Sequence, residues 1–416
     1  MQRQIKVFEH ERLTTSSNER GEKLTIDELE KLWEFNDRNG HKYFTGIRNG
    51  IKFKNYVGVI QIGNLTLEIL PKADNKQTNS PEDYEQWRKA LLNMLAICRH
   101  IKVDAVSEAN LDKRYHSLLD LYFEIFLDEV AGLLKRGLIK KYRKNESNTL
   151  ALKGRIVFNK HIQQNLIHQE RFYNTHQVYD YENLVNQILL RALSILPKVT
   201  SNVAILQRVK KLKLDFPEIK EINIQKSHFD KVKETRKTVL YKEALKVSKM
   251  IILNYSPDIK HGQENMLALL FDMNKLWEEY VYRMIQRNKP ENIEVNPQES
   301  QKFWETKTIR PDIVITKTEA GKNETFIIDT KWKIVEDYEP NDDDLKQMYA
   351  YNMYWNAEKS MLLYPQTGVM NETYGTFFKG REGENKCKLG FINVLDSDGK
   401  LDLGIGKKII GKLMAK

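Results

Sequence analysis

The sequence predicts an α+β multidomain protein with a β-rich N-terminal domain, a helical connector and a C-terminal α/β domain. Alternating apolar residues on both sides of Gly63-Asn64 predict a β-hairpin over residues 52–71. Apolar residues at helical spacing dominate the middle of the chain, from residue 181 to residue 254. Two short apolar runs, at 309–315 and 326–332, predict strands of a second sheet. We place the three domains at residues 1–165, 166–261 and 262–416.

The composition is that of a folded, soluble protein. Of the 416 residues, 41% are hydrophobic and 30% are charged, a balance that argues against disorder. No apolar run approaches the ~20 residues needed to cross a bilayer, and the first residues lack the apolar segment of a signal peptide. We therefore expect a cytoplasmic protein with no membrane partner. The net charge of +10 favours a nucleic-acid partner, although a lysine-rich proteome explains it equally well.

Several classes of site are not expected. The two cysteines, Cys98 and Cys387, lie far apart and offer neither a disulfide framework nor a zinc cluster. The nine histidines include no H-E-x-x-H motif, which argues against a transition-metal site. Residues 406–412 match only the first part of a P-loop, and Leu413 stands where Ser or Thr is required. A nucleotide-driven motor would therefore be another chain.

Periodicity and flanking residues place the remaining elements. Ser80-Pro81-Glu82 has the order of a helix N-terminus, and Pro197 is expected to end the helix that starts near Tyr181. An apolar stripe from Met266 to Met284 predicts a further helix. Other helices are predicted at about residues 82–98, 110–137, 200–212 and 228–254. Other strands are predicted at about residues 150–157, 360–364, 373–378 and 388–395.

Three charged residues interrupt the two apolar runs of the C-terminal domain. Asp312 lies in the first run, and Asp329 and Lys331 lie in the second, with residues 319–324 as the turn between them. Side chains alternate along a strand, so Asp329 and Lys331 project from one face and Thr330 from the other. We therefore expect the two acids and the lysine to meet at one edge of a sheet.

Such a group has a chemical and a structural interpretation. Carboxylate oxygens suit Mg²⁺, and an adjacent lysine can orient or deprotonate the water that attacks a phosphodiester. Charges on apolar strands are also costly unless they are paired or bind metal. The alternative is a surface hairpin with an Asp–Lys ion pair, because Pro-Asp followed by Asp-x-Lys arises by chance in many chains of this length.

Two helices can add polar side chains to this group. Glu278 lies beside the apolar stripe of its helix and can lean toward the strands that follow, although an isolated helix glutamate is most often solvated. Gln347 and Tyr351 are one turn apart on a helix predicted from about residue 344. Both can reach back toward the strand that carries Lys331.

These features together resemble the PD-(D/E)xK nuclease superfamily and, more narrowly, the McrC endonuclease subunits of McrBC-type (LlaJI-like) restriction systems. The resemblance extends over most of the chain and depends on the order and spacing of its blocks. The blocks are Tyr56-Val57-Gly58-Val59-Ile60, Ile69-Leu70-Pro71-Lys72, Leu152-Lys153-Gly154-Arg155-Ile156, residues 183–193, Met273-Asn274-Lys275-Leu276-Trp277-Glu278, Arg310-Pro311-Asp312, Asp329-Thr330-Lys331 and Asp344-Leu345-Lys346-Gln347. Trp277 departs from the phenylalanine expected before the glutamate, but Glu278 is in place.

The resemblance implies a PD-(D/E)xK restriction-endonuclease-like C-terminal domain that cleaves double-stranded DNA with Mg²⁺. Lys331 would orient the attacking water or stabilise charge, and Glu278 would be the acid of the upstream helix. The implied catalytic residues are Asp312, Asp329, Lys331, Glu278 and Gln347, and the implied metal ligands are Asp312, Asp329 and Thr330. The N-terminal domain, residues 1–165, would dock on a McrB-like AAA+ GTPase and stimulate it.

Two alternatives stay open. One is a stand-alone PD-(D/E)xK nuclease for DNA repair. The other is a non-catalytic adaptor that binds DNA or activates a motor protein. The intact Asp312, Asp329 and Lys331 argue against the adaptor, which has no need to keep them.

Overall fold

The computed structural model of the chain groups it into two compact units. One contains residues 1–3, 60–65 and 119–269, and the other contains residues 4–59, 66–118 and 270–416. The structure describes residues 3–18, 20–73, 80–100, 117–256, 266–333, 340–365, 374–377 and 385–415. None of the described helices is long and apolar enough to cross a membrane. The N-terminal and C-terminal segments belong largely to one unit, and the domain boundaries at residues 165 and 261 stay predictions.

The N-terminal segment is rich in strands, as expected. Gly63 adopts a φ of 52°, a left-handed conformation that permits the tight turn between β5 and β6, so the predicted hairpin is confirmed. The sequence analysis did not predict helix α1 (Ile26–Arg38). Thr25 caps its N-terminus and forms a capping box with Glu28. The elements are β1 (Arg3–Phe8), β2 (Arg12–Thr14), α1 (Ile26–Arg38), β3 (Phe44–Ile47), β4 (Gly50–Phe53), β5 (Tyr56–Ile62), β6 (Leu65–Leu70) and α2 (Pro81–Ile97). Strands β1, β5 and β6 join two later strands, β10 (Tyr255–Ser256) and β11 (Met266–Asp272), in a sheet with the order β1-β6-β5-β11-β10. Strands β2, β3 and β4 form a second sheet in the order β2-β4-β3.

The middle of the chain is mainly helical, with two departures from prediction. Pro197 lies inside α6 and does not end it; the helix continues for two more residues, to Val199. The helix expected over 228–254 is instead three short elements, α8, η2 and α9. The start of the helix predicted from residue 110 lies outside the described residues. The helices are α4 (Leu118–Arg136), α6 (Leu184–Val199), α7 (Val203–Asp215), α8 (Lys226–Asp230), the 3-10 helix η2 (Val239–Tyr241) and α9 (Lys242–Asn254).

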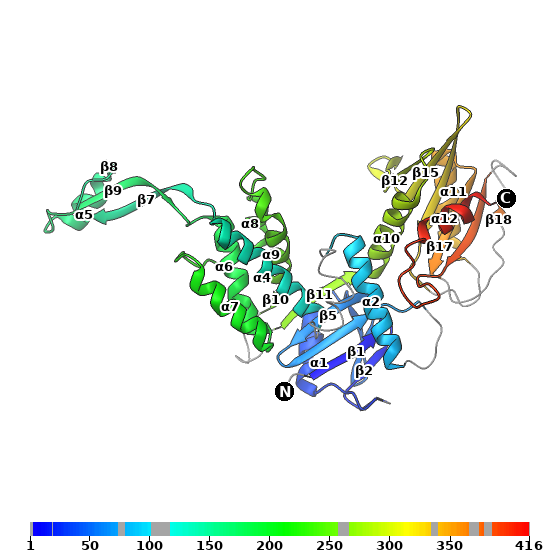
Figure 1. Ribbon diagram of the computed structural model, residues 1–416, viewed down its shortest axis with the longest axis horizontal. Helices are drawn as coiled ribbons and strands as arrows, with labels where there is room; N and C mark the ends of the chain where they lie inside the picture. The colour runs from blue at the N-terminus through cyan, green and yellow to red at the C-terminus, as the bar shows by residue number, and fades with distance from the viewer. Residues whose placement is uncertain are drawn as a thin grey trace. The chain divides into compact units, whose positions relative to one another are not determined.

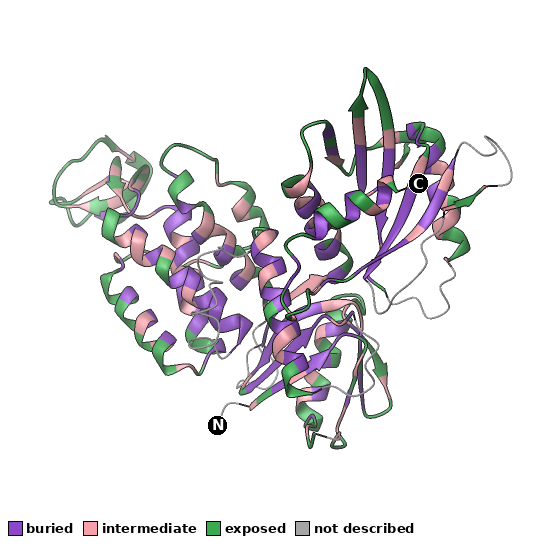
Figure 2. Ribbon diagram, turned by 45° about the vertical axis from the view of Figure 1, so that its right-hand side comes forward, coloured by how far each residue is buried: buried purple, intermediate pink, exposed green. Residues whose placement is uncertain are grey.

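A long β-arm, residues 141–180, extends away from these helices (Figure 1). Only Arg155–Ile156 of the strand predicted at 150–157 is a strand, because Gly154 adopts a φ of +67° just before it. The arm consists of β7 (Lys141–Thr149), β8 (Arg155–Ile156), α5 (Phe158–Asn165) and β9 (Phe172–Asp180), with strand order β7-β9-β8. Figure 2 shows that most of its residues are exposed or half-buried.

The prediction of a helix from Met266 was wrong for its first part. Met266–Asp272 forms strand β11, which lies between β5 and the short strand β10 (Tyr255–Ser256). Helix α10 (Met273–Asn288) begins only after Asp272, whose side chain caps it by accepting a hydrogen bond from the Asn274 backbone N–H. A continuous apolar run fits a buried strand as well as a buried helix, so spacing alone could not separate the two.

The C-terminal segment forms a mixed six-stranded sheet in the order β12-β15-β16-β17-β19-β18. Strands β12, β15 and β16 are antiparallel, β16, β17 and β19 are parallel, and β18 is antiparallel to β19. The turn between β15 and β16 is only Ala320-Gly321, both with positive φ, so it is shorter than the predicted 319–324. The strands are β12 (Ile293–Pro297), β15 (Ile313–Glu319), β16 (Lys322–Thr330), β17 (Lys359–Pro365), β18 (Tyr374–Thr376) and β19 (Lys386–Ile392). A separate hairpin consists of β13 (Gln301–Trp304) and β14 (Lys307–Ile309).

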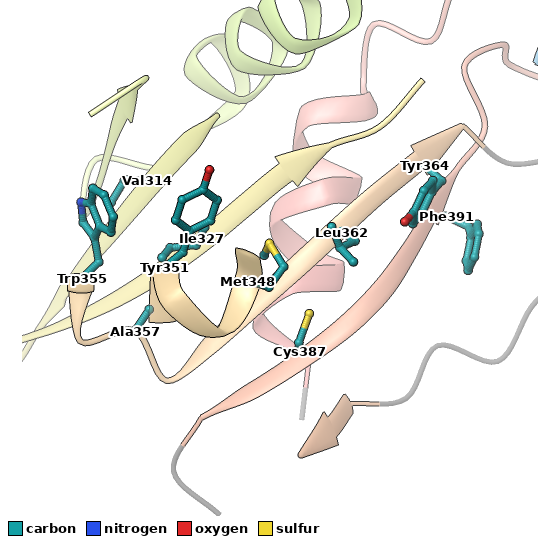
Figure 3. Close-up of a cluster of buried hydrophobic side chains, with 10 residues drawn as sticks. All are labelled: Val314, Ile327, Met348, Tyr351, Trp355, Ala357, Leu362, Tyr364, Cys387 and Phe391. Atoms are coloured by element: carbon teal, nitrogen blue, oxygen red, sulfur yellow. The ribbon is translucent and has the colours of Figure 1, made fainter. Parts of the chain in front are cut away.

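Helix α11 (Asp342–Trp355) packs on one face of this sheet (Figure 3). Alternate residues of four strands face it, including Val314, Ile327, Leu362 and Phe391, and they enclose Met348. A strand buried on both faces must be apolar at consecutive positions, as Ile313 to Ile315 are. The core cluster is Val314, Ile327, Met348, Tyr351, Trp355, Ala357, Leu362, Tyr364, Cys387 and Phe391. This packing fixes α11 against the strands that carry the candidate site.

The P-loop-like segment is part of helix α12 (Ile405–Met414), whose apolar face is buried. A Cβ atom at Gly406 would overlap the backbone of Met284 and Ile285 in α10. The glycine therefore permits close packing of two helices and does not contact a nucleotide.

Candidate active site

The register of β15 and β16 brings the two predicted acids together. Ile313 pairs with Ile328, so Asp312 and Asp329 lie next to each other where the two strands end their pairing. Asp329 follows Ile327 by two residues and therefore faces α11, as Ile327 does. The backbone of Lys331 is tied to β17 by a hydrogen bond from its N–H to the Leu363 carbonyl, 2.9 Å. The acids thus lie at the end of a rigid, buried strand.

Asp312 is held in place by the residue after Asp329. Its Oδ2 atom accepts hydrogen bonds from the Thr330 backbone N–H, 2.7 Å, and from the Thr330 hydroxyl, 2.8 Å. The side chain of Thr330 is therefore directed toward Asp312. Its hydroxyl is engaged with that carboxylate.

Lys331 is the centre of an ion-pair network. Its Nζ atom lies 2.8 Å from Oδ2 of Asp329, 3.1 Å from Oδ1 of Asp344 and 3.4 Å from Oε1 of Gln347. Asp344 also pairs with Lys333, 2.9 Å away. The ammonium is thus held between a strand carboxylate and a helix carboxylate.

The buried carboxylates are short of compensating positive charge. Burial, and then the neighbouring Asp312 carboxylate, raise the pKa of Asp329. Burial also raises the pKa of Asp312, against the hydrogen bonds from Thr330 that favour its charged form. Burial alone would lower the pKa of Lys331, but Asp329 and Asp344 outweigh that effect and raise it. The site therefore keeps its lysine charged and favours the approach of a further cation.

Gln347 and Tyr351 reach the site as the helical spacing predicts. The Gln347 amide donates to the Tyr351 hydroxyl, 2.6 Å, and that hydroxyl donates to the Arg310 carbonyl, 2.9 Å. Burial raises the pKa of Tyr351 to about 12, so its hydroxyl stays a donor at neutral pH. These bonds tie α11 to the segment immediately before Asp312.

Glu278 lies near Asp312 and is connected to it through Gln298. The Gln298 side chain donates to Glu278 Oε1, 2.6 Å, and its backbone N–H donates to the Asp312 carbonyl, 2.9 Å. Burial, and then the Asp312 charge, raise the pKa of Glu278. In the described part of the chain, no three His, Cys, Asp or Glu side chains converge as a metal-binding group. Glu278 thus lies beside the pair of aspartates without completing a cluster with them.

The residue after Lys331 anchors the strand end on the N-terminal segment of the same unit. The Trp332 indole N–H donates to Glu9, 2.5 Å, and the Trp332 backbone N–H donates to Asn274, 3.3 Å. The Trp332 ring also packs against Trp277 of α10, with centroids 5.3 Å apart. The position of Lys331 therefore depends on a buried contact between distant parts of the sequence.

Sequence reasoning missed two of these residues. Asp344 precedes Gln347 by three residues, so its place on the same helix face was a readable signal. Glu9 gave no such signal, since nothing in the local sequence pairs it with Trp332.

The comparisons with known proteins agree with this architecture. A relative in Escherichia coli (strain K12), the type IV methyl-directed restriction enzyme EcoKMcrBC, is 25% identical over 209 residues, or 49% of this chain and 59% of that protein. The refined half-complex from the tetradecameric assembly of Thermococcus gammatolerans McrB AAA+ hexamers with bound McrC contains a chain with a similar fold. That match has a TM-score of 0.71 and 21% identity and covers 99% of both chains.

A second solved structure, the cryo-EM structure of the Thermococcus gammatolerans McrBC complex, matches with a TM-score of 0.51 and 21% identity. It covers 69% of this chain and 88% of that chain. The family model of the McrBC 5-methylcytosine restriction system component matches residues 51–365, most of the chain and both candidate aspartates. The expected McrC-like relationship is confirmed, and the chain belongs to the McrBC 5-methylcytosine restriction system component family.

Proposed function

We propose that this chain is the Mg²⁺-dependent DNA endonuclease subunit of a McrBC-like restriction complex. It cleaves phosphodiester bonds of double-stranded DNA when assembled with a McrB-like AAA+ GTPase, which it activates. Family membership supports the restriction role. The observation that carries the nuclease assignment is the convergence of Asp312, Asp329 and Lys331 at the end of one strand pair.

The pair of carboxylates fits Mg²⁺. Oδ2 of Asp329 is buried, and the Lys331 ammonium lies 2.8 Å from it. Hard carboxylate oxygens suit this ion, which is commonly held by one or two carboxylates with water and substrate phosphate completing its shell. Asp312 and Asp329 would hold the metal, with Thr330 as a further ligand. Bound there, Mg²⁺ would polarise the scissile phosphate and lower the pKa of an attacking water.

The chain's own residues have separate roles. Lys331 is kept protonated by its two carboxylate neighbours, so it donates to a phosphate oxygen or to the water and stabilises negative charge. Gln347 accepts from Lys331 and limits its rotation. Glu278, with its raised pKa, is placed to exchange a proton near Asp312. The mixed sheet with α10 before it and α11 after Lys331 supports a PD-(D/E)xK domain within residues 262–416.

The docking role is proposed for residues 1–165, with residues 166–261 as the connector. The arm contains a concentration of exposed apolar side chains, which mark an interaction surface in a soluble protein. Within residues 1–165 they are Tyr142, Leu150, Leu152, Phe158 and Ile162, and the arm adds Leu166, Ile167 and Tyr179 beyond that boundary. Replacing Phe158 and Ile162 by Ser in the full chain is expected to weaken stimulation of GTP hydrolysis and leave the nuclease site intact.

The test is DNA cleavage by the chain assembled with the AAA+ GTPase encoded beside it. Asp329→Asn and Lys331→Ala should abolish Mg²⁺-dependent cutting of a methylated plasmid and still stimulate GTP hydrolysis. Lys322→Ala, at the exposed start of β16, is the matched control and should cut like the wild type. Undiminished cutting by the Asp329 and Lys331 variants would refute the assigned site.

Two other outcomes decide for the alternatives. Robust cutting by the isolated chain without nucleotide would favour a stand-alone nuclease. Stimulated GTP hydrolysis with no cutting by the wild-type complex, under any metal condition, would favour a non-catalytic adaptor.

A further inference from the structure

The β13–β14 hairpin exposes two large aromatic side chains next to the candidate active site. Phe303 is 50% exposed and Trp304 is 63% exposed, whereas the other five tryptophans are between 0% and 36% exposed. The hairpin ends at Ile309 and leads directly into Arg310-Pro311-Asp312. Exposing two neighbouring aromatic side chains to water is unfavourable, so their exposure here points to a ligand that covers them.

The hairpin is fixed and not a loose loop. The register shifts between Lys302 and Trp304, so Phe303 is the extra residue of a β-bulge, a device that redirects side chains. The Phe303 ring packs against Tyr354 of α11, with centroids 5.7 Å apart, and the Tyr354 hydroxyl donates to the Phe303 carbonyl, 3.4 Å. Phe303 is therefore held by the same helix that carries Gln347.

A cleft of about 740 Å³ lies between the hairpin and α11. Its walls include Phe303, Arg310, Gln347 and Tyr351. Gln347 also accepts a hydrogen bond from Lys331, so the cleft borders the candidate active site at this residue.

The charge of the hairpin is suited to a polyanion. Lys302 and Lys307 are exposed, on paired strands, and neither has an ion-pair partner within the described ranges. The turn between the strands carries one exposed acid, Glu305. Arg310, at the end of the hairpin, is also exposed. Lysines beside stacked aromatics form the combination that holds single nucleic-acid strands, with phosphates on the charges and bases on the rings.

We propose that the β13–β14 hairpin binds the DNA strand that enters the candidate active site. Lys302 and Lys307 contact phosphates, and Phe303 and Trp304 stack on bases that are unpaired or unstacked near the scissile phosphate. This inference rests on the proposed function and adds the part of the substrate that the hairpin contacts. A base offers its face only in a single strand or at a kinked step, so the hairpin prefers locally opened DNA over a regular duplex.

The first test uses tryptophan fluorescence of the full chain titrated, without divalent ions, with a single-stranded oligonucleotide and with the corresponding duplex. DNA should quench the wild type, and Trp33→Phe, which removes the next most exposed tryptophan, should keep the quenching. Trp304→Phe should lose the quenching and keep the affinity. Trp304→Ala should bind single-stranded DNA about five- to 150-fold more weakly, as expected for one lost base stack. Wild-type affinity of Trp304→Ala, or no measurable binding by the wild type at low salt, would overturn the proposal.

The second test separates the lysines from general charge. The affinity for DNA falls as salt is added, and the slope of log affinity against log salt measures how steeply. In the double variant Lys302→Ala/Lys307→Ala this slope should become shallower by between about one and two, because two phosphate contacts are lost. Lys322→Ala removes an exposed lysine from the neighbouring hairpin and should leave the slope unchanged. Equal slopes for the wild type and the double variant would refute the phosphate contacts.

Failure of this inference can be distinguished from failure of the proposed function. Both tests measure DNA binding without divalent ions, so their results do not depend on whether the complex proves to be a nuclease. If the complex cuts DNA but Trp304→Ala binds normally, only the hairpin assignment is wrong. If Trp304→Ala binds weakly but the wild-type complex does not cut, only the nuclease assignment is wrong.

Discussion

Glu9 is expected to destabilise the protein at neutral pH, and Glu9→Gln should relieve that cost. Its side chain is fully buried, and burial raises its pKa from 4.5 to about 8, although hydrogen bonds from Trp332 and Lys72 favour the charged form. Oε1 accepts both of these bonds, whereas Oε2 is buried without a hydrogen bond, with His10 Nε2 3.8 Å away. A glutamine can keep the accepting oxygen in place and cannot ionise.

The size of the effect follows from the two pKa values. Because the folded pKa lies above the unfolded one, folding takes up a proton, and stability present below about pH 4.5 is lost as the pH rises toward 8. This cost is about 1 kcal/mol near pH 5, about 3 kcal/mol near pH 7 and about 5 kcal/mol above pH 8. At neutral pH the substitution should therefore raise the unfolding temperature by about 6–12 °C for a unit of this size.

The assay is thermal unfolding of the full chain, followed by tryptophan fluorescence at about pH 5, 7 and 9. The difference between Glu9→Gln and the wild type should grow with pH. The control is Glu30→Gln, an exposed glutamate on α1, which should differ little from the wild type at every pH. A Glu9→Gln variant that is less stable throughout, or whose advantage does not change with pH, would refute the assignment of a buried, mostly protonated Glu9.

Three further outcomes are expected. Asp344→Asn should slow cleavage by the assembled complex about tenfold, the value of one charge-assisted hydrogen bond, while Asp342→Asn on the same helical turn should not; equal rates would show that Asp344 does not position the lysine. Gly406→Ala should destabilise the α10–α12 packing by about 1–3 kcal/mol in thermal unfolding, whereas Gly411→Ala, with open space around its Cβ, should be neutral or stabilising; similar behaviour of the two would contradict the close approach. Burial raises the pKa of Asp329, so protons compete with Mg²⁺ for this carboxylate at a higher pH than for an ordinary aspartate. As the pH is lowered, the Mg²⁺ affinity measured by calorimetry should therefore begin to fall at a higher pH than an ordinary aspartate would give. Asp329→Asn should remove that dependence.

Much of the candidate site was readable because its residues are close in sequence. Asp329 and Lys331 are two residues apart on a strand, so the alternation of side chains already placed them on one face. Gln347 and Tyr351 are one helical turn apart, and the structure shows both directed at the site. The tight hairpin between β5 and β6 was equally clear, because Gly63 takes a backbone conformation that few other residues tolerate.

The sequence by itself determined the β-rich start, the helical middle, the Asp312, Asp329 and Lys331 group and the McrBC-family resemblance, because local periodicity and residue order carry that information. Only the tertiary structure decided that Met266–Asp272 is a strand, since burial between neighbouring strands outweighs helical spacing in a continuous apolar run. It also decided that Glu9 supports the strand end at Trp332. Such a contact depends on how distant segments pack, and no local pattern in the sequence records it.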